Sequence, residues 1–159
     1  MIKYARKAFA SFETGGIYLM ASLSLTPLKP LSKIASGGEM SRIMLAFKKI
    51  TGDYDEIPTM IFDEIDSGIS GIAASVVGRK LKEIAMTHQI ICITHLPQIA
   101  AFGEHSYKIE KQTGESSTYT TITELTADEK VQEIARLLGG ATITDTTLKS
   151  AKELIQSSK

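Results

Sequence analysis

Two adjacent acidic residues, Asp63 and Glu64, directly follow a short apolar segment at residues 59–62. A segment of this kind after a proline, Pro58, predicts a buried strand in a parallel sheet that helices cover. Open α/β sheets bind their ligands at the carboxyl ends of such strands. One carboxylate there can hold Mg²⁺, and its neighbour can orient or deprotonate a water that attacks a phosphoryl group. The alternative is that both acids are simply solvated at a strand end.

A histidine, His95, follows a second apolar segment, residues 89–94, which we also predict to be a buried strand. Between the two segments, apolar residues predict a helix with one buried face: Ile72, Ala73, Val76, Val77, Leu81, Ile84 and Ala85. Strand, helix and strand at this spacing form a βαβ unit, whose crossover is almost always right-handed. We therefore expect His95 at the same sheet edge as Asp63 and Glu64. A lone histidine is more often structural, but this position favours a catalytic role.

A third polar cluster, residues 36–39 with the sequence Ser-Gly-Gly-Glu, precedes a helical pattern of apolar residues. Ser36 and Glu39 match a capping box, which satisfies free N–H groups at the start of a helix. Gly37 and Gly38 are not needed for a cap. They leave backbone N–H groups uncovered at the positive end of a helix, where phosphate oxygens bind well. Taken by itself, the motif favours the capping interpretation.

Composition places few further limits on function. The 159 residues fit one domain, and 18 basic residues balance 18 acidic ones, so net charge indicates neither a nucleic-acid nor a membrane surface. The single cysteine, Cys92, excludes an intrachain disulfide and fits a reducing, cytoplasmic setting. His88, Cys92 and His95 lack an evident fourth ligand for zinc. No apolar segment approaches the roughly 18 residues of a membrane span.

The remaining chain is predicted to complete an α/β domain. We expect a short helix at 96–102, an antiparallel hairpin at 106–112 and 118–125, and helices at 128–138 and 145–158. Gly139 and Gly140 are expected to end the first of these two helices. Residues 1–30 are hard to interpret, with a possible helix at 3–9 and a possible strand at 17–20.

Three segments resemble motifs of ABC-type ATPase heads, and more narrowly of the RecN family, which is related to the SMC proteins. Residues 31–42 resemble the signature motif, residues 61–71 resemble Walker B with the D-loop, and residues 93–100 resemble the switch-histidine region. The resemblance extends from about residue 30 to the C-terminus and includes residues 133–140. It implies an α/β fold, namely the C-terminal lobe of an ABC/SMC-type P-loop ATPase head, with residues 31–159 as that lobe.

The resemblance also implies site roles. Asp63 matches the Walker B acid that holds Mg²⁺, Glu64 the catalytic base, and His95 the switch residue that senses the γ-phosphate of ATP. The D-loop that couples two sites is matched by Asp66 and Ser67. Four residues match the signature loop that contacts ATP on the opposite head: Ser36, Gly37, Gly38 and Glu39. ATP is then bound between two heads of a homodimer.

The chain contains no G-x-x-x-x-G-K-[ST] phosphate loop. In the family this Walker A loop belongs to an N-terminal lobe beyond a long coiled coil, so we expect that lobe as a partner and little ATPase activity from this chain alone. The resemblance implies a protein of DNA double-strand-break repair and recombination that handles DNA without a membrane. Two alternatives are another SMC-like, chromosome-organising ATPase and a non-catalytic dimerisation module with the same fold.

Overall fold

The computed structural model describes residues 10–11, 18–19, 35–51, 57–113 and 117–159. Near the N-terminus, β1 (Ala10–Ser11) pairs antiparallel with β2 (Tyr18–Leu19). The strand expected at residues 17–20 is thus present in its described part. The helix expected at 3–9 and the first residues of the signature motif lie outside the described ranges.

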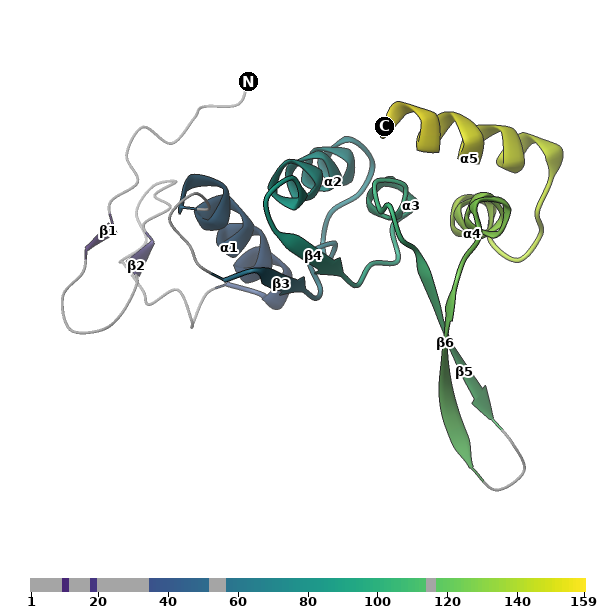
Figure 1. Ribbon diagram of the computed structural model, residues 1–159, viewed down its shortest axis with the longest axis horizontal. Helices are drawn as coiled ribbons and strands as arrows, with labels where there is room; N and C mark the ends of the chain where they lie inside the picture. The colour runs from purple at the N-terminus through teal and green to yellow at the C-terminus, as the bar shows by residue number, and fades with distance from the viewer. Residues whose placement is uncertain (1–9, 12–17, 20–34, 52–56, 114–116) are drawn as a thin grey trace.

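A parallel strand pair lies at the centre of the molecule (Figure 1). Strands β3 (Thr59–Phe62) and β4 (Gln89–Cys92) pair in register, with Thr59 opposite Gln89 and Phe62 opposite Cys92. Helix α2 (Gly71–Ala85) connects them, and α1 (Gly37–Thr51) packs beside α2. The predicted βαβ unit is confirmed.

Among the described residues only one face of this strand pair is buried, so the prediction of buried strands is confirmed for one face and wrong for the other. In β3, Met60 and Phe62 are 7% and 5% exposed, whereas Ile61 between them is 68% exposed. Alternate residues of a strand point to opposite faces. The helices pack on the face of Met60 and Phe62, while Ile91 and Ile93 of the second strand segment stay exposed beside Ile61. The buried cluster comprises Leu45, Met60, Phe62, Ile65, Ala74, Val77, Leu81, Ile84 and Ile99.

The buried face of α2 matches the predicted one only in part, at Val77, Leu81 and Ile84. The structure buries Ala74, Val77, Gly78, Leu81 and Ile84. Of the predicted face, Ile72 and Val76 are instead exposed, as are Ala73 and Ala85. Gly78 lies against the ring of Phe102 with little room for a side chain, so this side of α2 packs closely on the segment that contains α3.

A second apolar cluster joins the three C-terminal helices. It lies between α3 (Pro97–Ala100), α4 (Ala127–Gly139) and α5 (Asp145–Ser157) and includes the buried residues Ala101, Ile134, Ala135 and Ala151. Capping boxes begin both long helices, at Thr126 and Thr144, and Gly140 ends α4 with φ +79°. These helices agree with the predicted ranges to within a few residues. None of the described helices is long and apolar enough to cross a membrane.

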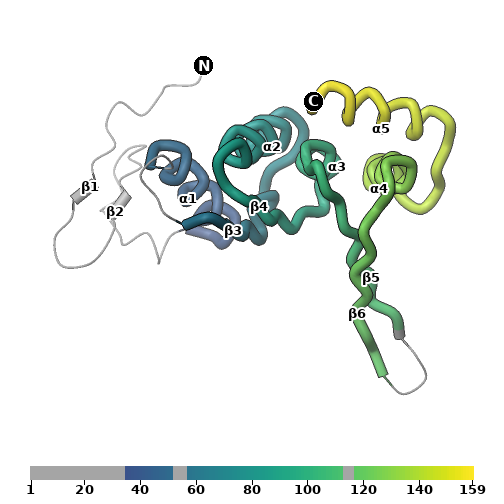
Figure 2. Tube along the Cα trace, viewed as in Figure 1, coloured from purple at the N-terminus to yellow at the C-terminus, as the bar shows by residue number. Residues whose placement is uncertain are grey.

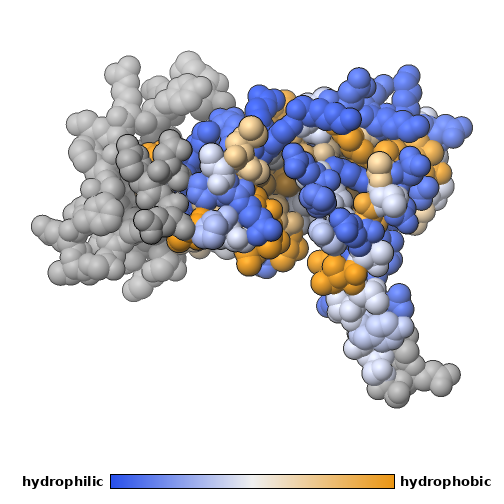
Figure 3. Space-filling view, viewed as in Figure 1, coloured by the Kyte–Doolittle hydropathy of each residue, from blue (hydrophilic) through white to orange (hydrophobic). Residues whose placement is uncertain are grey.

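The predicted antiparallel hairpin is confirmed and projects away from the helices (Figures 1 and 2). It consists of β5 (Tyr107–Thr113) and β6 (Thr118–Glu124), with Ile109 opposite Ile122. Both isoleucines are more than half exposed. Figure 3 shows apolar surface at the base of this hairpin and along the neighbouring strand pair. Two-stranded sheets of this kind are marginally stable without a further layer.

Candidate functional site

The ends of β3 and β4 bring the acidic pair and the histidine segment together. Parallel register places Phe62 opposite Cys92, and the backbone N–H of Ile93 donates to the carbonyl oxygen of Phe62 at 2.9 Å. Asp63 and Glu64 therefore leave the sheet beside Thr94 and His95. These residues line an open cleft of about 560 Å³. The predicted meeting of the acids and His95 at one sheet edge is confirmed.

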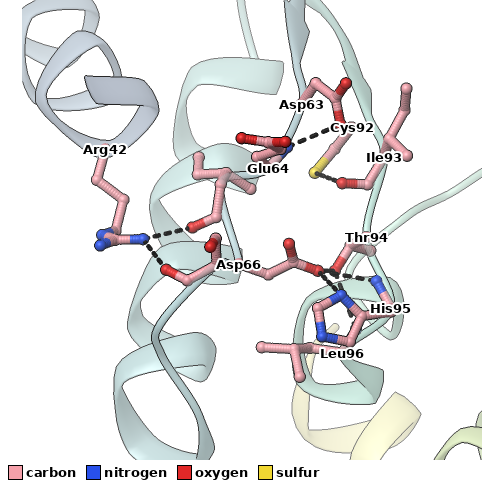
Figure 4. Close-up of polar contacts among 11 residues, drawn as sticks. Arg42, Asp63, Glu64, Asp66, Cys92, Ile93, Thr94, His95 and Leu96 are labelled. Carbon is pink, nitrogen blue, oxygen red and sulfur yellow. Dashed lines mark hydrogen bonds and ion pairs between the residues drawn. The ribbon is translucent and has the colours of Figure 1, made fainter. Parts of the chain in front are cut away.

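Asp66 is the buried link between the two segments (Figure 4). Its side chain is only 5% exposed. The Oδ2 atom accepts hydrogen bonds from Thr94 Oγ1 at 2.6 Å and from the backbone N–H of His95 at 2.8 Å. Burial acts to raise the pKa of Asp66, but these two hydrogen bonds and the nearby His95 hold it below its usual range. Asp66 is therefore a carboxylate at neutral pH.

The same carboxylate orients the imidazole of His95. Nδ1 of His95 lies 2.9 Å from Oδ2 of Asp66, while the His95 side chain is 75% exposed. A carboxylate accepts but does not donate, so Nδ1 carries the proton in this contact. Nε2 is thereby left for a ligand in the cleft. The sequence identified the histidine, but it did not indicate that Asp66 would be the residue holding it.

Glu64 and Asp63 are both exposed at the cleft. The backbone N–H of Glu64 donates to Oδ1 of Asp63 at 2.8 Å. Glu64 itself has φ +55°, in the left-handed region that residues other than glycine seldom adopt. Oδ2 of Asp63 makes no hydrogen bond within the part of the chain that the structure describes. Oδ2 of Asp63 and the Glu64 carboxylate therefore face solvent.

Residues 36–39, which we call the signature cluster, form the predicted capping box at the start of α1. The backbone N–H of Ser36 donates to Oε2 of Glu39 at 2.9 Å, and the Glu39 N–H donates to Ser36 Oγ at 3.3 Å. The hydrogen bonds from the Ser36 backbone and hydroxyl lower the pKa of Glu39. The capping interpretation is thus confirmed for these two side chains, and a contact of Ser36 with phosphate stays a prediction.

The two glycines allow α1 to approach residues 63–67 closely. We call this segment after β3 the acidic turn. A Cβ at Gly38 would lie 2.8 Å from the backbone oxygen of Glu64 and 2.7 Å from the Cβ of Ser67. A Cβ at Gly37 would lie 2.3 Å from Oε2 of Glu64. All three distances are shorter than real carbon contacts. Gly38 meets backbone and therefore has a packing role, in addition to the phosphate role that the sequence suggested, whereas a side chain at Gly37 would only displace the flexible end of Glu64.

Two neighbours of the signature cluster hold the acidic turn, a role that was not predicted although both residues belong to the motif of residues 31–42. Ser41 Oγ donates to the carbonyl oxygen of Asp63 at 2.8 Å. Nη1 of Arg42 donates to the carbonyl oxygens of Ile65 and Ser67, at 3.0 and 2.7 Å (Figure 4). Serine and arginine in an amphipathic helix normally indicate only a polar face.

Several bacterial DNA repair proteins are similar to this chain. RecN of Haemophilus influenzae is 49% identical over 137 residues, which are 86% of this chain and 24% of that protein. RecN of Bacillus subtilis is 42% identical over 139 residues, with corresponding shares of 87% and 24%. RecN of Deinococcus radiodurans is 46% identical over 128 residues. No protein-family model matches the chain.

This chain is a homologue of the C-terminal part of RecN. It spans about a quarter of the length of these relatives. A solved structure also has the same fold, with a TM-score of 0.57 over 85% of this chain and 83% of the other, at 20% identity. That structure comes from a study of ATP-driven dimerisation and DNA-stimulated activation of SMC ATPases. The predicted α/β fold of an SMC-type head lobe is confirmed.

The residues of the cleft could supply only part of a Mg²⁺ site. Within the described ranges, no three His, Cys, Asp or Glu side chains are arranged to hold a metal. Magnesium in phosphoryl-transfer sites usually takes one or two carboxylates, several waters and phosphate oxygens. Asp63 offers a free, exposed oxygen of the required type at this cleft. The residues present therefore fit a Mg²⁺ ion that arrives with its nucleotide.

Cys92 takes no part in this chemistry. Burial, with the charges of Asp66 and Asp63, raises the pKa of its thiol to about 12. A thiol with such a pKa is protonated at neutral pH and is a poor nucleophile. In this RecN homologue Cys92 is partly buried and packs against the main buried cluster.

Proposed function

We propose that residues 31–159 form the C-terminal lobe of an ATP-hydrolysing head in a RecN-type protein of DNA double-strand-break repair and recombination. The observation that carries this proposal is the parallel pairing of β3 and β4. It brings Asp63, Glu64 and His95 to one cleft, bordered by the start of α1. Identity of 42–49% to RecN of two species favours this family over other SMC-like ATPases.

The cleft residues divide the chemistry of ATP hydrolysis between them. Asp63 would hold Mg²⁺ through its Oδ2 atom, and the ion would supply positive charge against the phosphate groups. Glu64 orients the attacking water and accepts its proton. Nε2 of His95 faces the γ-phosphate, because Asp66 holds Nδ1. The Asp66 carboxylate is buried and already bonded, so we assign it to positioning His95 instead of touching the nucleotide.

The signature cluster serves the nucleotide of a second head. Residues 36–39 lie at the start of α1, where the helix dipole favours phosphate oxygens. Ser36, Gly37 and Glu39 are exposed there, whereas Gly38 is buried against the turn that follows β3. Ser67 follows in the D-loop and is exposed at the same cleft. This arrangement supports a homodimer in which ATP is bound between the two heads. ATP binding and dimerisation are then one event.

An N-terminal lobe with a Walker A loop completes each site. This chain has no such loop to hold the β-phosphate. Ile61, Ile91 and Ile93 leave one face of a parallel strand pair uncovered, although parallel sheets are normally covered on both faces. The RecN relatives are about four times as long as the matched region, which leaves room for this lobe. By itself the chain hydrolyses ATP negligibly.

The bacterial RecN relatives support a place in the cytoplasm, at the nucleoid, where the intact protein acts on DNA. A non-catalytic dimerisation module is the weaker alternative. Such a module has no use for the acidic pair or for a histidine held by a buried carboxylate.

Nucleotide-dependent dimerisation tests the proposal. This chain is mixed with the N-terminal lobe of the Haemophilus influenzae relative, and the mass of the complex is measured by analytical ultracentrifugation. With Glu64→Gln and Mg-ATP we expect the mass to double, because ATP stays bound and unhydrolysed. Ser36→Arg should abolish this doubling. Thr126→Arg, which places an arginine at the remote N-cap of α4, should not. A mass that ATP leaves unchanged in the Glu64→Gln complex refutes the composite site.

A further inference from the structure

Glu64 is the one residue other than glycine with positive φ among the described residues. Its φ of +55° lies in a region that L-residues occupy only where the surrounding structure imposes it. A strand that ends in solvent does not require this conformation. The contacts around Glu64 must therefore impose it.

Hydrogen bonds fix the peptide groups on both sides of Glu64. Ser41 Oγ donates to the carbonyl oxygen of Asp63, at 2.8 Å, and the N–H of the same peptide group donates to Asp63 Oδ1. The carbonyl oxygen of Glu64 accepts from the backbone N–H of Ser67 at 2.9 Å. With both peptide planes held, the φ and ψ angles of Glu64 are determined.

Helix α1 supplies the external part of this restraint. Ser41 and Arg42, which are adjacent in the helix, together hold the carbonyl oxygens of Asp63, Ile65 and Ser67. These are alternate residues of the turn, so Glu64 lies between two held positions. The absent side chain of Gly38 lets the helix contact the Glu64 carbonyl directly, and the Glu64 carboxylate lies against Gly37.

We propose that Ser41 and Arg42 are positioning residues for Glu64. By holding the carbonyl groups around it, they impose the left-handed conformation that aims the Glu64 carboxylate into the cleft. Both residues belong to α1. If the start of this helix is displaced when it contacts the phosphate bound to the second head, Glu64 therefore moves with it. The catalytic part of this inference rests on the proposed function, whereas the backbone restraint does not.

The backbone restraint is tested in the chain by itself with nuclear magnetic resonance. The ¹³Cα and ¹³Cβ shifts of Glu64 and its HN–Hα coupling report the left-handed conformation. We expect this signature to be lost in Ser41→Ala and Arg42→Ala and restored in Ser41→Thr, whose hydroxyl can make the same bond. Matched controls are Ser75→Ala and Arg79→Ala on α2, which should leave the Glu64 signals unchanged. Ser41 is only partly buried, so removing its hydroxyl should not unfold the chain.

The catalytic consequence is measured in the complex with the N-terminal lobe of the relative. We expect Ser41→Ala to lower kcat by about 10-fold, with KM for ATP changed less than about twofold, since the bond orients Glu64 and does not bind substrate. Ser41→Thr should restore kcat.

The outcomes separate this inference from the proposed function. Retention of the left-handed signature in both Ser41→Ala and Arg42→Ala overturns the inference, whatever the activity. A lost signature with unchanged kcat in an active complex also overturns it. A lost signature in a chain whose unsubstituted complex never hydrolyses ATP upholds the restraint and refutes the ATPase proposal.

Discussion

The carboxylate of Asp66 combines burial with several hydrogen bonds, and this makes it a pH-sensitive stabilising group. Its folded-state pKa is lowered, so its stabilising contribution is complete above the unfolded pKa of about 3.9 and is lost as the pH falls through the folded value. Asp66→Asn should lower the free energy of unfolding by about 1–3 kcal/mol at pH 7, since hydrogen bonds to a charge are lost. The difference from the unsubstituted chain should shrink below about pH 4.

Urea unfolding followed by circular dichroism at pH 7 and pH 3 measures this difference. Glu104→Gln, a change of the same charge at an exposed position, serves as the control. An equal loss of stability at both pH values for Asp66→Asn would contradict the assignment of a buried, charged carboxylate.

Residue types and order were sufficient to predict some of the site but not all of it. Asp63, Glu64 and His95 could be identified because each follows an apolar strand segment, and strand ends are where α/β sheets bind ligands. Ser41 and Arg42 were placed only within the signature motif, and their contacts were not predictable because these depend on which backbone oxygens α1 meets after folding. Thr94, whose hydroxyl donates to Asp66, was missed for the same reason.

At the scale of elements, α1 must lie directly on the acidic turn. Gly38→Ala would place a methyl group 2.7–2.8 Å from three atoms of Glu64 and Ser67, two of them backbone oxygens. Backbone cannot move aside cheaply, so we expect a loss of about 1–3 kcal/mol in the free energy of unfolding. Thermal unfolding measures it. The comparison is Gly103→Ala, whose added carbon comes no closer than 3.3 Å to its neighbours and should cost less. Equal costs would show that the approach of α1 is looser than described.

Element order was predictable, but the orientation of elements was less so. Periodicity and turn residues located the strand pair, the hairpin and the C-terminal helices. The rotation of α2 was not predictable, because apolar residues occur on more than one side of it and the sequence does not show that Gly78 packs against Phe102. The half-exposed strands were also missed, since an apolar sequence does not reveal which neighbour covers each face.

At the scale of the whole molecule, the uncovered face of β3 and β4 is the surface we assign to the N-terminal lobe. Ile61 is 68% exposed, so Ile61→Thr should leave the stability of this chain nearly unchanged. It should weaken binding of the N-terminal lobe about 10-fold or more, since burial of an isoleucine side chain contributes about 1.5–3 kcal/mol. Isothermal titration calorimetry measures the affinity.

Ile72→Thr is the matched control, because Ile72 is 85% exposed on α2, away from the strand pair. If both substitutions weaken binding equally, or if neither does, the strand face is not the interface.

The most direct test of the central claim is Mg²⁺-dependent release of phosphate from ATP, by this chain alone and with the N-terminal lobe of the relative supplied. We expect turnover only in the mixture, lowered by at least about 100-fold in Glu64→Gln, since general-base catalysis contributes about 10²–10⁴-fold. Turnover by the chain alone that depends on Glu64 would mean that the site needs no second lobe. Turnover in the mixture that survives Glu64→Gln would contradict the role of Glu64, and absence of turnover in both would contradict the ATPase proposal itself.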